Sequence, residues 1–436
     1  MHMQTASKKV INGWAMYDWA NSVYNLVITT TFFPIYFLSS TKAHFNSERI
    51  PFFGKFFVSS ALYDYAMAAA FLVAAIFSPI LSSIADTRGN KKRYLMMFTW
   101  LGGISCSALY FFNGANVEFG VIFFILATLG YCGGLVFYNS YLPEIATLED
   151  RDRVSARGFS LGYIGSVLMQ LIGFALVVVK PFGISDGQAV LITFLLVGVW
   201  WIGFAQITFF RLPASVPAVE QHKGSALTEG FSELRKVYAQ VKQMPVLKMY
   251  LRGFFFYSMG VQTVMMAATI FGSDELHLSA TLLIVTVVVI QLVGVLGAWG
   301  IARLSDKFGN LPVLIAVVIL WIGICIAGYR VTTANEFYVL AAGVGLVMGG
   351  VQSLSRSTYA KLMPETKDTA SFFSYYDVTE KISIVIGMST FGFIHEQTGS
   401  MRNSVLALTA FFILGLICLL FAFKKNATLK NETIHN

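Results

Sequence analysis

The sequence predicts an all-α membrane protein with twelve transmembrane helices in two pseudo-symmetric bundles of six. Composition, the spacing of the apolar runs and a repeated pair of loop motifs support this prediction. Of the 436 residues, 56% are hydrophobic and 12% are charged, whereas an average soluble domain has about 25% charged residues. The apolar residues come in runs of about 20, the length of a membrane-spanning helix. They lack the alternation of barrel strands.

The apolar runs place the twelve spans. Windows of about 19 residues predict spans at 12–39, 57–85, 94–113, 118–142, 155–179, 188–211, 246–272, 279–303, 311–330, 336–359, 370–394 and 402–423. The longest polar segment, 212–245, separates an N-terminal bundle, 1–211, from a C-terminal bundle, 246–436. Within this segment, apolar residues at helical spacing over 227–241 predict a helix on the membrane surface.

Lysine and arginine are divided unevenly between the two sides of the predicted membrane. The N-terminus, every second loop, the 212–245 segment and the C-terminal tail hold most of them. The opposite loops hold only Lys42, Arg49, Lys55, Lys180, Arg330 and Arg402. By the positive-inside rule, both termini and the 212–245 linker are expected to be cytoplasmic. The net charge of +8 then lines a membrane face, which argues against nucleic acid as a partner.

Two loop motifs recur at nearly the same offset. Residues 86–90 (DTRGN) follow the second span and residues 306–310 (DKFGN) follow the eighth, 220 positions later. Residues 141–144 (YLPE) follow the fourth span, and 361–365 (KLMPE) follow the tenth with the proline offset by 221. Two independent motifs at nearly one offset predict parallel repeats of six spans, related by an axis along the membrane normal.

The repeated loops predict a cytoplasmic gate. Glycine permits a tight reversal, and aspartate can accept backbone N–H bonds or pair with an arginine of a neighbouring helix. Inter-helix charge contacts are expected between arginines and glutamates near the same loops. The gate candidates are Asp86, Arg88, Gly89, Glu144, Arg151, Arg153, Asp306, Gly309, Arg356 and Glu365. The alternative is a set of capped turns whose charges only set topology.

Residues 83–92 (SIADTRGNKK) resemble the conserved loop motif of the major facilitator superfamily. Residues 13–22 (GWAMYDWANS) and 260–263 (GVQT) resemble the branch that contains the fungal vacuolar amino-acid effluxers and their bacterial relatives. That branch carries Asn-Asp before the glycine of the seventh span, where this chain has Ser258 and Met259. The resemblance implies the major facilitator fold, a bacterial inner membrane location, and a secondary carrier whose halves rock around a central site.

Polar residues of the first span form the first part of a candidate site. Asp18, Ser22, Asn25 and Thr29 share one stripe of an α-helix, with Asn21 beside it. A polar stripe on an apolar span faces water or protein rather than lipid. Such residues can hydrogen-bond a polar solute, or they can hydrogen-bond a neighbouring helix.

Charged residues of the eleventh span form the second part. Asp377 and Lys381 stand at i and i+4, a spacing that favours an ion pair, and Glu380 lies between them. Charges within a span are costly unless they face a cavity or a partner. We expect Asp18 or Glu380 to bind a driving proton and Lys381 to meet an anionic group of the solute. The alternative is a neutral ion-pair network that only holds helices together.

The candidate residues fall into two groups. Substrate-binding candidates are Asp18, Asn21, Ser22, Asn25, Gln262, Tyr375 and Lys381, and proton-coupling candidates are Asp18, Asp377 and Glu380. All six histidines lie at predicted loops or chain ends and no phosphate-binding loop motif is found. We therefore expect no enzyme activity, no metal and no cofactor.

The expected function is secondary active transport of a small polar solute, driven by a co-transported proton. The resemblance implies efflux of an amino acid or a small peptide. Two alternatives stay open: a membrane sensor or receptor derived from a carrier fold, and a carrier for sugars or another metabolite. We expect a monomer in the lipid bilayer.

Overall fold

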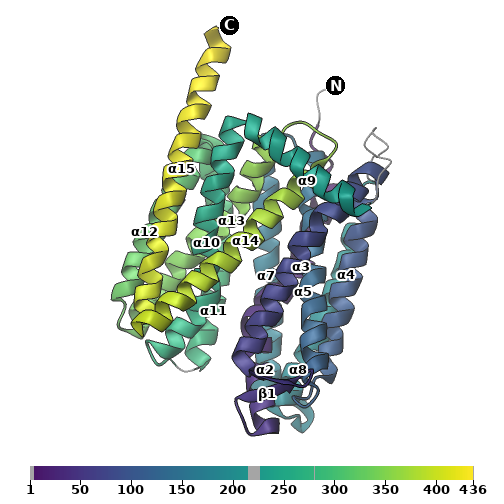
Figure 1. Ribbon diagram of the computed structural model, residues 1–436, viewed down its shortest axis with the longest axis vertical. Helices are drawn as coiled ribbons and strands as arrows, with labels where there is room; N and C mark the ends of the chain where they lie inside the picture. Colours follow the sequence, from purple (N-terminus) through teal and green to yellow (C-terminus); the bar gives the residue numbers. More distant parts are fainter. Residues whose placement is uncertain (1–3, 215–225, 279, 436) are drawn as a thin grey trace. The chain divides into compact units, whose positions relative to one another are not determined.

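The structure is a computed structural model that describes residues 4–214, 226–278 and 280–435, and it is built almost entirely of long helices (Figure 1). The first half of the chain contains α1 (Lys8–Val23), η1 (Tyr24–Phe32), α2 (Phe33–Phe45), β1 (Arg49–Phe52), β2 (Lys55–Val58), α3 (Ser59–Arg88), α4 (Lys91–Ala108), η2 (Leu109–Phe111), α5 (Val117–Ser140), α6 (Leu142–Ile145), α7 (Arg151–Val179), η3 (Pro181–Gly183) and α8 (Asp186–Arg211). The second half contains α9 (Ala226–Gln243), α10 (Pro245–Asp274), α11 (Ala280–Phe308), α12 (Asn310–Arg330), α13 (Ala334–Leu362), α14 (Thr369–Thr398) and α15 (Met401–His435).

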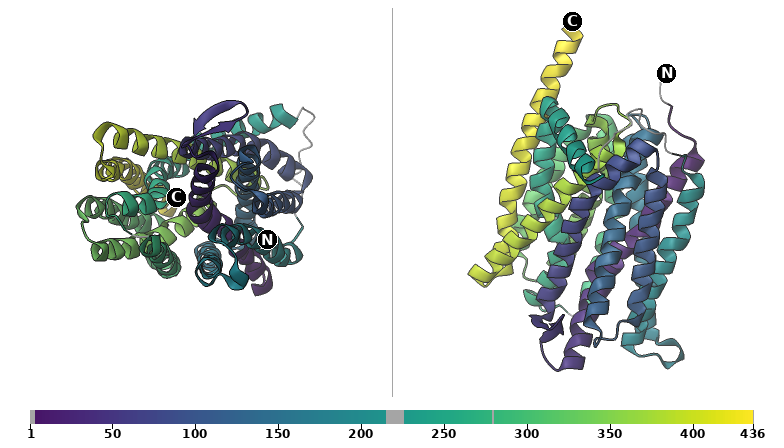
Figure 2. Two further views of the ribbon diagram at one scale, coloured as in Figure 1. Left: turned by 90° about the horizontal axis from the view of Figure 1, so that it is seen from below. Right: turned by 45° about the vertical axis from the view of Figure 1, so that its right-hand side comes forward.

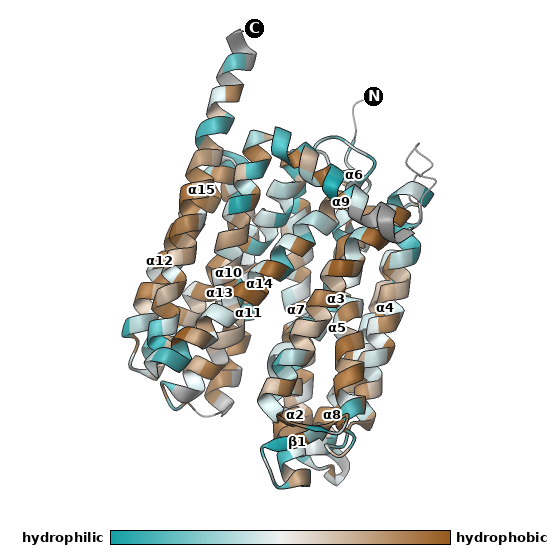
Figure 3. Cartoon of the chain, in the orientation of Figure 1, coloured by the Kyte–Doolittle hydropathy of each residue, from teal (hydrophilic) through white to brown (hydrophobic). Residues whose placement is uncertain are grey.

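Each predicted span contains a long helix, so the predicted all-α architecture is confirmed. Within the described residues, ten helices are long and apolar enough to cross a membrane. The 30-residue helices α10 and α14 complete the set of twelve. The last helix continues to His435, beyond the predicted end at 423, and it extends past its neighbours α10 and α12 (Figure 2). Hydrophilic residues gather on α9 and on this extension, whereas apolar residues dominate the other helices (Figure 3).

The chain forms two compact units whose boundaries cross the sequence. One unit contains Ser7–Asn139 and Leu161–Leu227, and the other contains Met1–Ala6, Ser140–Ser160 and Thr228–Asn436. The segment that joins α5 to the start of α7 therefore belongs with the C-terminal helices. Ala156 of this segment packs against Ala298 and Ala302 of α11 in a buried apolar cluster.

The first span is not a continuous α-helix, because η1 is a π-helix. Hydrogen bonds in a π-helix run over five residues instead of four, so each turn is wider. The α-helical spacing from which the polar stripe was predicted therefore does not hold over η1, which contains Asn25 and Thr29. Asp18 and Thr29 are buried, whereas Ser22 and Asn25 are half-buried. Insertions of π-helix are frequent at functional sites.

A β-hairpin stands between α2 and α3, where the sequence predicted a loop. Strands β1 and β2 pair antiparallel, with Phe52 opposite Lys55. Phe53 and Gly54 make the turn with φ angles of 46° and 77°, the left-handed pair that a two-residue hairpin needs. Strands of four residues are too short for alternation to predict them.

The linker helix α9 forms as predicted. Glu233, Val237 and Val241 are buried, whereas Tyr238 is exposed. The position of this helix on the membrane surface stays a prediction. The side chains of 227–231 lie outside the described residues.

Helices α11 and α13 meet backbone to backbone. A Cβ atom on Gly349 of α13 would lie 2.0 Å from the carbonyl oxygen of Gly294, and one on Gly297 of α11 would lie 2.0 Å from that of Leu346. Membrane helices approach this closely only through small residues, because lipid gives no hydrophobic force between them.

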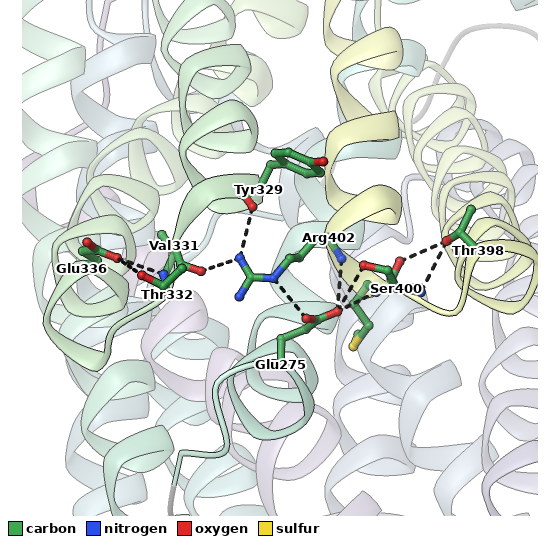
Figure 4. A network of polar contacts seen from close by, with 9 residues as sticks. Glu275, Tyr329, Val331, Thr332, Glu336, Thr398, Ser400 and Arg402 are labelled. Carbon is green, nitrogen blue, oxygen red and sulfur yellow. Dashed lines mark hydrogen bonds and ion pairs between the residues drawn. The ribbon is translucent and has the colours of Figure 1, made fainter.

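A network around Arg402 joins three segments at one end of the C-terminal helices (Figure 4). Arg402 Nε donates to Glu275 Oε2 at 3.1 Å, and its Nη1 donates to the carbonyls of Tyr329 and Val331. Glu275 Oε1 accepts the backbone N–H of Met401 at 2.9 Å. The end of α10, the loop after α12 and the start of α15 are thereby held together.

Arg402→Ala is expected to lower the free energy of unfolding by about 1–2 kcal/mol, because it removes hydrogen bonds from Glu275 and from two backbone carbonyls. The shift in SDS-induced unfolding of the purified protein measures this loss. Arg330→Ala is the control, since Arg330 is exposed in the same region. An equal loss in that control would show that the positive charge matters at this end and that the network does not.

Candidate functional site

Asp18 is buried in α1 and held by an aromatic group. Its Oδ2 accepts the hydroxyl hydrogen of Tyr138 at 2.8 Å. Trp14 stacks on the Tyr138 ring at 4.4 Å, and its indole nitrogen donates to the Tyr138 carbonyl at 2.9 Å. Tyr17 lies against the same ring at 4.9 Å. The carboxyl group is thus oriented by a rigid aromatic frame inside the membrane-spanning region.

The amides beside Asp18 differ in their surroundings. Asn21 is fully buried, and both polar atoms of its side chain lack a hydrogen-bond partner among the described residues. Ser22 packs against α7, where a Cβ atom on Gly162 would lie 2.5 Å from the Ser22 hydroxyl oxygen. Asn25 is half-buried within η1. Burying an amide without hydrogen bonds costs free energy. Hydrogen bonding to a neighbouring helix therefore does not explain why Asn21 is buried.

The charged residues of α14 meet Gln262 of α10. Lys381 Nζ lies 3.1 Å from Asp377 Oδ1 and 3.5 Å from Glu380 Oε2, so the ion pair expected from the i,i+4 spacing is present. Gln262 Nε2 donates to Glu380 Oε1 at 3.0 Å. Asp377 and Lys381 are buried, whereas 23% of the Glu380 side chain is exposed. We call Asp377, Glu380, Lys381 and Gln262 the α14 cluster.

Aromatic rings border the α14 cluster. Tyr376, next to Asp377 in the chain, stacks on Phe254 of α10 at 4.2 Å. The Tyr257 hydroxyl lies 2.7 Å from the Ser355 hydroxyl. Tyr375 is half-buried on the same turn of α14. The cluster therefore combines one partly exposed carboxyl group with an amide and flat apolar surfaces.

The two repeated loops at 86–90 and 306–310 have the predicted tight turns but different contacts. Gly89 and Gly309 have φ angles of 66° and 85°, so each uses a conformation that favours glycine. Asp86 is buried and lies 3.1 Å from Lys91 Nζ, whereas Asp306 is exposed. The repeat in sequence therefore does not extend to equivalent charge contacts.

Asp152, in the first turn of α7, is the centre of a buried polar network. Its carboxylate accepts hydrogen bonds from Lys361 at 2.5 Å, Asn310 at 2.7 Å and Ser305 at 2.9 Å. Lys361 also donates to Asn310 Oδ1 at 3.0 Å. The Asp152 side chain is fully buried and the Lys361 side chain is 22% exposed. We call Asp152, Ser305, Asn310 and Lys361 the Asp152 network.

Two predicted gate arginines lie beside this network. Arg151 donates to the Ala360 carbonyl at 2.5 Å. Arg356 donates through Nε to Ser155 Oγ at 2.9 Å and through Nη2 to the Ser155 carbonyl at 2.8 Å, and it covers the Phe159 ring at 4.2 Å. Both guanidinium groups thus join the segment 140–160 to α13 mainly through oxygen atoms of backbone and hydroxyl groups.

The other gate candidates lie nearer the surface. Glu144 is exposed, with its Oε1 accepting the Thr369 hydroxyl hydrogen at 2.8 Å. Arg153 pairs with Asp150 at 2.6 Å and its side chain is 73% exposed. Arg88 and Glu365 are exposed. Their roles at a gate stay predictions.

Sequence reasoning missed Asp152, Ser305, Asn310 and Lys361. One signal was present, because Asn90 and Asn310 end the two repeated loop motifs at the same offset of 220 as their aspartates. Lys361 begins the repeated motif at 361–365, which gave no sign of its partner, and Asp152 lies in a segment rich in mixed charges without any such motif.

Solved structures define the class of this fold. The chain resembles the crystal structure of the human organic anion transporter MFSD10 (TETRAN), with a TM-score of 0.76, 11% identity, and 95% of this chain and 100% of that chain covered. It also resembles the major facilitator superfamily transporter FucP in the outward conformation, with a TM-score of 0.69, 12% identity, and coverage of 95% and 98%. These likenesses establish the major facilitator fold, with twelve helices in two bundles.

The family described as vacuole effluxer Atg22 like matches residues 6–149 and 145–430, and the chain belongs to this family. The uncharacterized MFS-type transporter YxiO of Bacillus subtilis (strain 168) is 28% identical over 424 residues, covering 96% of this chain and 95% of the relative. Autophagy-related protein 22 of Kluyveromyces lactis is 26% identical over 465 residues, covering 94% and 92%. The chain is therefore a multi-pass membrane transporter of the major facilitator class.

Proposed function

We propose that the protein is a secondary active transporter that moves a small polar solute by alternating access. The observation that carries this proposal is the α14 cluster, because Lys381 lies about 18 Å along α14 from its first residue, near mid-bilayer. Charges at that depth mark solute or ion pathways in membrane proteins. Asp18, Asn21, Ser22, Asn25, Gln262 and Tyr375 are the further solute-binding candidates.

The solute we propose is an amino acid or a small peptide, moved outward. The effluxer family supports this direction, and the mixture of carboxyl groups, amides and aromatic rings suits a zwitterion with a side chain. A screen in proteoliposomes that covers amino acids, small peptides and sugars under an imposed proton gradient tests the choice. Accumulation of a sugar without any amino acid or peptide would replace this solute class.

We further propose that both termini face the cytoplasm and that the Asp152 network is part of a gate on that side. The distribution of lysine and arginine supports this orientation. The network supports a gate because it bonds the segment 140–160 of the first half of the chain to α11–α13 of the second half. Breaking these contacts would release that segment.

Glu380 is the residue we propose as the proton carrier, with Asp18 and Asp377 as the alternatives. Its side chain is the more exposed of the two carboxylates in the α14 cluster, at 23% against 7% for Asp377, and a neutral partner, Gln262, bonds one of its oxygens. Glu380→Gln is expected to abolish solute-dependent proton movement, which a pH dye inside proteoliposomes detects. Proton movement that persists in Glu380→Gln would remove the proton role of Glu380, and persistence in Asp18→Asn and Asp377→Asn as well would remove that of the alternatives.

A non-transporting sensor is the second candidate function, because a sensor derived from a carrier would keep the same buried cluster. Flux and binding separate the two. Binding of a solute with no flux under any gradient would favour the sensor, whereas flux that depends on a gradient would exclude it.

A further inference from the structure

The α14 cluster has an excess of negative charge. Asp377 and Glu380 carry two carboxylates, and Lys381 lies within 3.5 Å of both. The single ammonium group is therefore already paired twice. With both acids ionised the three residues sum to −1, so an anion that approaches them meets a site of its own sign.

Acceptor capacity remains on both carboxylates. Asp377 is buried, and its Oδ2 lacks a hydrogen-bond partner among the described residues. Glu380 Oε1 accepts one bond from Gln262, whereas a carboxylate oxygen can accept about two. The cluster therefore has more hydrogen-bond acceptors than donors. A ligand that donates several hydrogen bonds would match it.

Helices α10 and α15 pack against α14, and α15 carries no charged residue between Arg402 and Lys424. Helix α10 carries no charged residue between Arg252 and Asp274. Arg356 of α13 donates to Ser155 and covers the Phe159 ring, and its charge also acts on Tyr376 of α14. The rings of Phe254 and Tyr376 supply a flat surface beside the acids.

We propose that Asp377 and Glu380 bind the ammonium group of the solute and that Lys381 acts as their internal counter-ion. This inference rests on the proposed solute-binding role of the α14 cluster, and it assigns Lys381 differently from the expectation that it meets an anionic group. A primary ammonium has three donors in a compact charge, which matches two neighbouring carboxylates. The solute class is a primary amine or a zwitterion that presents its ammonium to α14.

Three probes with one carbon skeleton test the charge preference. Phenethylamine carries only an ammonium, 3-phenylpropionate carries only a carboxylate, and phenylalanine carries both; ethylamine, propionate and alanine repeat the comparison on a smaller skeleton. Binding is measured by calorimetry on the purified full-length protein at pH 7. Probes with an ammonium are expected to bind at least about tenfold more tightly than the matching carboxylates, a difference of about 1.4 kcal/mol.

Variants of the cluster link this preference to residues. Asp377→Asn and Glu380→Gln are each expected to weaken binding of the ammonium probes at least about tenfold. Asp64→Asn is the matched control, because Asp64 is an exposed acid of another span, α3. Partition of amines into detergent is the same in all these variants and therefore cancels. The partly exposed Glu380 keeps the test valid if Asp377→Asn fails to fold.

Lys381→Met separates the two assignments of the lysine. If Lys381 is a counter-ion, Lys381→Met is expected to bind phenethylamine as tightly as the unchanged protein or more tightly. If Lys381 instead binds an anionic group, the same variant is expected to lose binding of 3-phenylpropionate. Tighter binding of the carboxylate probes than the amine probes, binding of none of the probes, or equal effects of Asp64→Asn and Glu380→Gln would overturn the inference. Ammonium-selective binding without flux in proteoliposomes would instead retain the inference and contradict transport.

Discussion

Gly349→Ala is expected to push α11 and α13 apart and to lower the free energy of unfolding by about 3 kcal/mol, at the upper end of the usual cost of overpacking. The added Cβ would stand 2.0 Å from the Gly294 carbonyl oxygen. A backbone atom cannot rotate away as a side chain can, so a whole helix must move. The shift in SDS-induced unfolding and the recovery of monodisperse protein in detergent measure the effect.

Gly343→Ala is the control on the same helix. The nearest atom to its added Cβ would be Ile324 Cδ1 at 3.9 Å, an ordinary contact, and alanine favours helix by up to about 1 kcal/mol over glycine. This variant is expected to be neutral or slightly more stable. If both variants lose stability equally, the loss comes from the reduced flexibility of the helix and not from the close approach of α11 and α13.

Asp152→Ala is expected to cost about 3–5 kcal/mol, the usual result of removing one partner of a buried ion pair. The substitution leaves Lys361, Asn310 and Ser305 without their shared acceptor. The loss is expected to unlock the segment 140–160 from the C-terminal helices. Faster proteolysis or hydrogen exchange confined to that segment detects the release, and SDS-induced unfolding measures the free energy.

Arg153→Ala provides the comparison, because Arg153 is one residue away in an exposed ion pair with Asp150. Exposed pairs contribute about 0–1 kcal/mol, so little change is expected. A double-mutant cycle with Lys361→Ala isolates the coupling of the buried pair. Additive losses in that cycle would mean that Asp152 and Lys361 do not stabilise each other.

Much of the fold could be predicted because lipid imposes a simple rule. A span needs about 20 apolar residues, and every predicted span contains a helix. The elements that were not predicted are those whose formation does not depend on the length of an apolar run. Strands β1 and β2 have four residues each, and η1 differs from an α-helix by hydrogen bonds over one more residue, which no hydropathy pattern encodes.

The candidate site was less accessible from the sequence. Spacing predicted the pair of Asp377 and Lys381 because both stand on one helix. It gave no sign that Gln262 bonds Glu380, 118 positions away, or that Asp152 bonds Lys361. Contacts between distant segments depend on how the helices pack. A periodic pattern predicts only which residues of one helix lie on the same face.

The position of Asp152 has a consequence for synthesis. A ribosome delivers Asp152 to the membrane well before Lys361, which follows 209 residues later in the chain. Ser305 and Asn310, the other partners of Asp152, are also made before that lysine. The complete Asp152 network can therefore form only when translation is more than four-fifths complete.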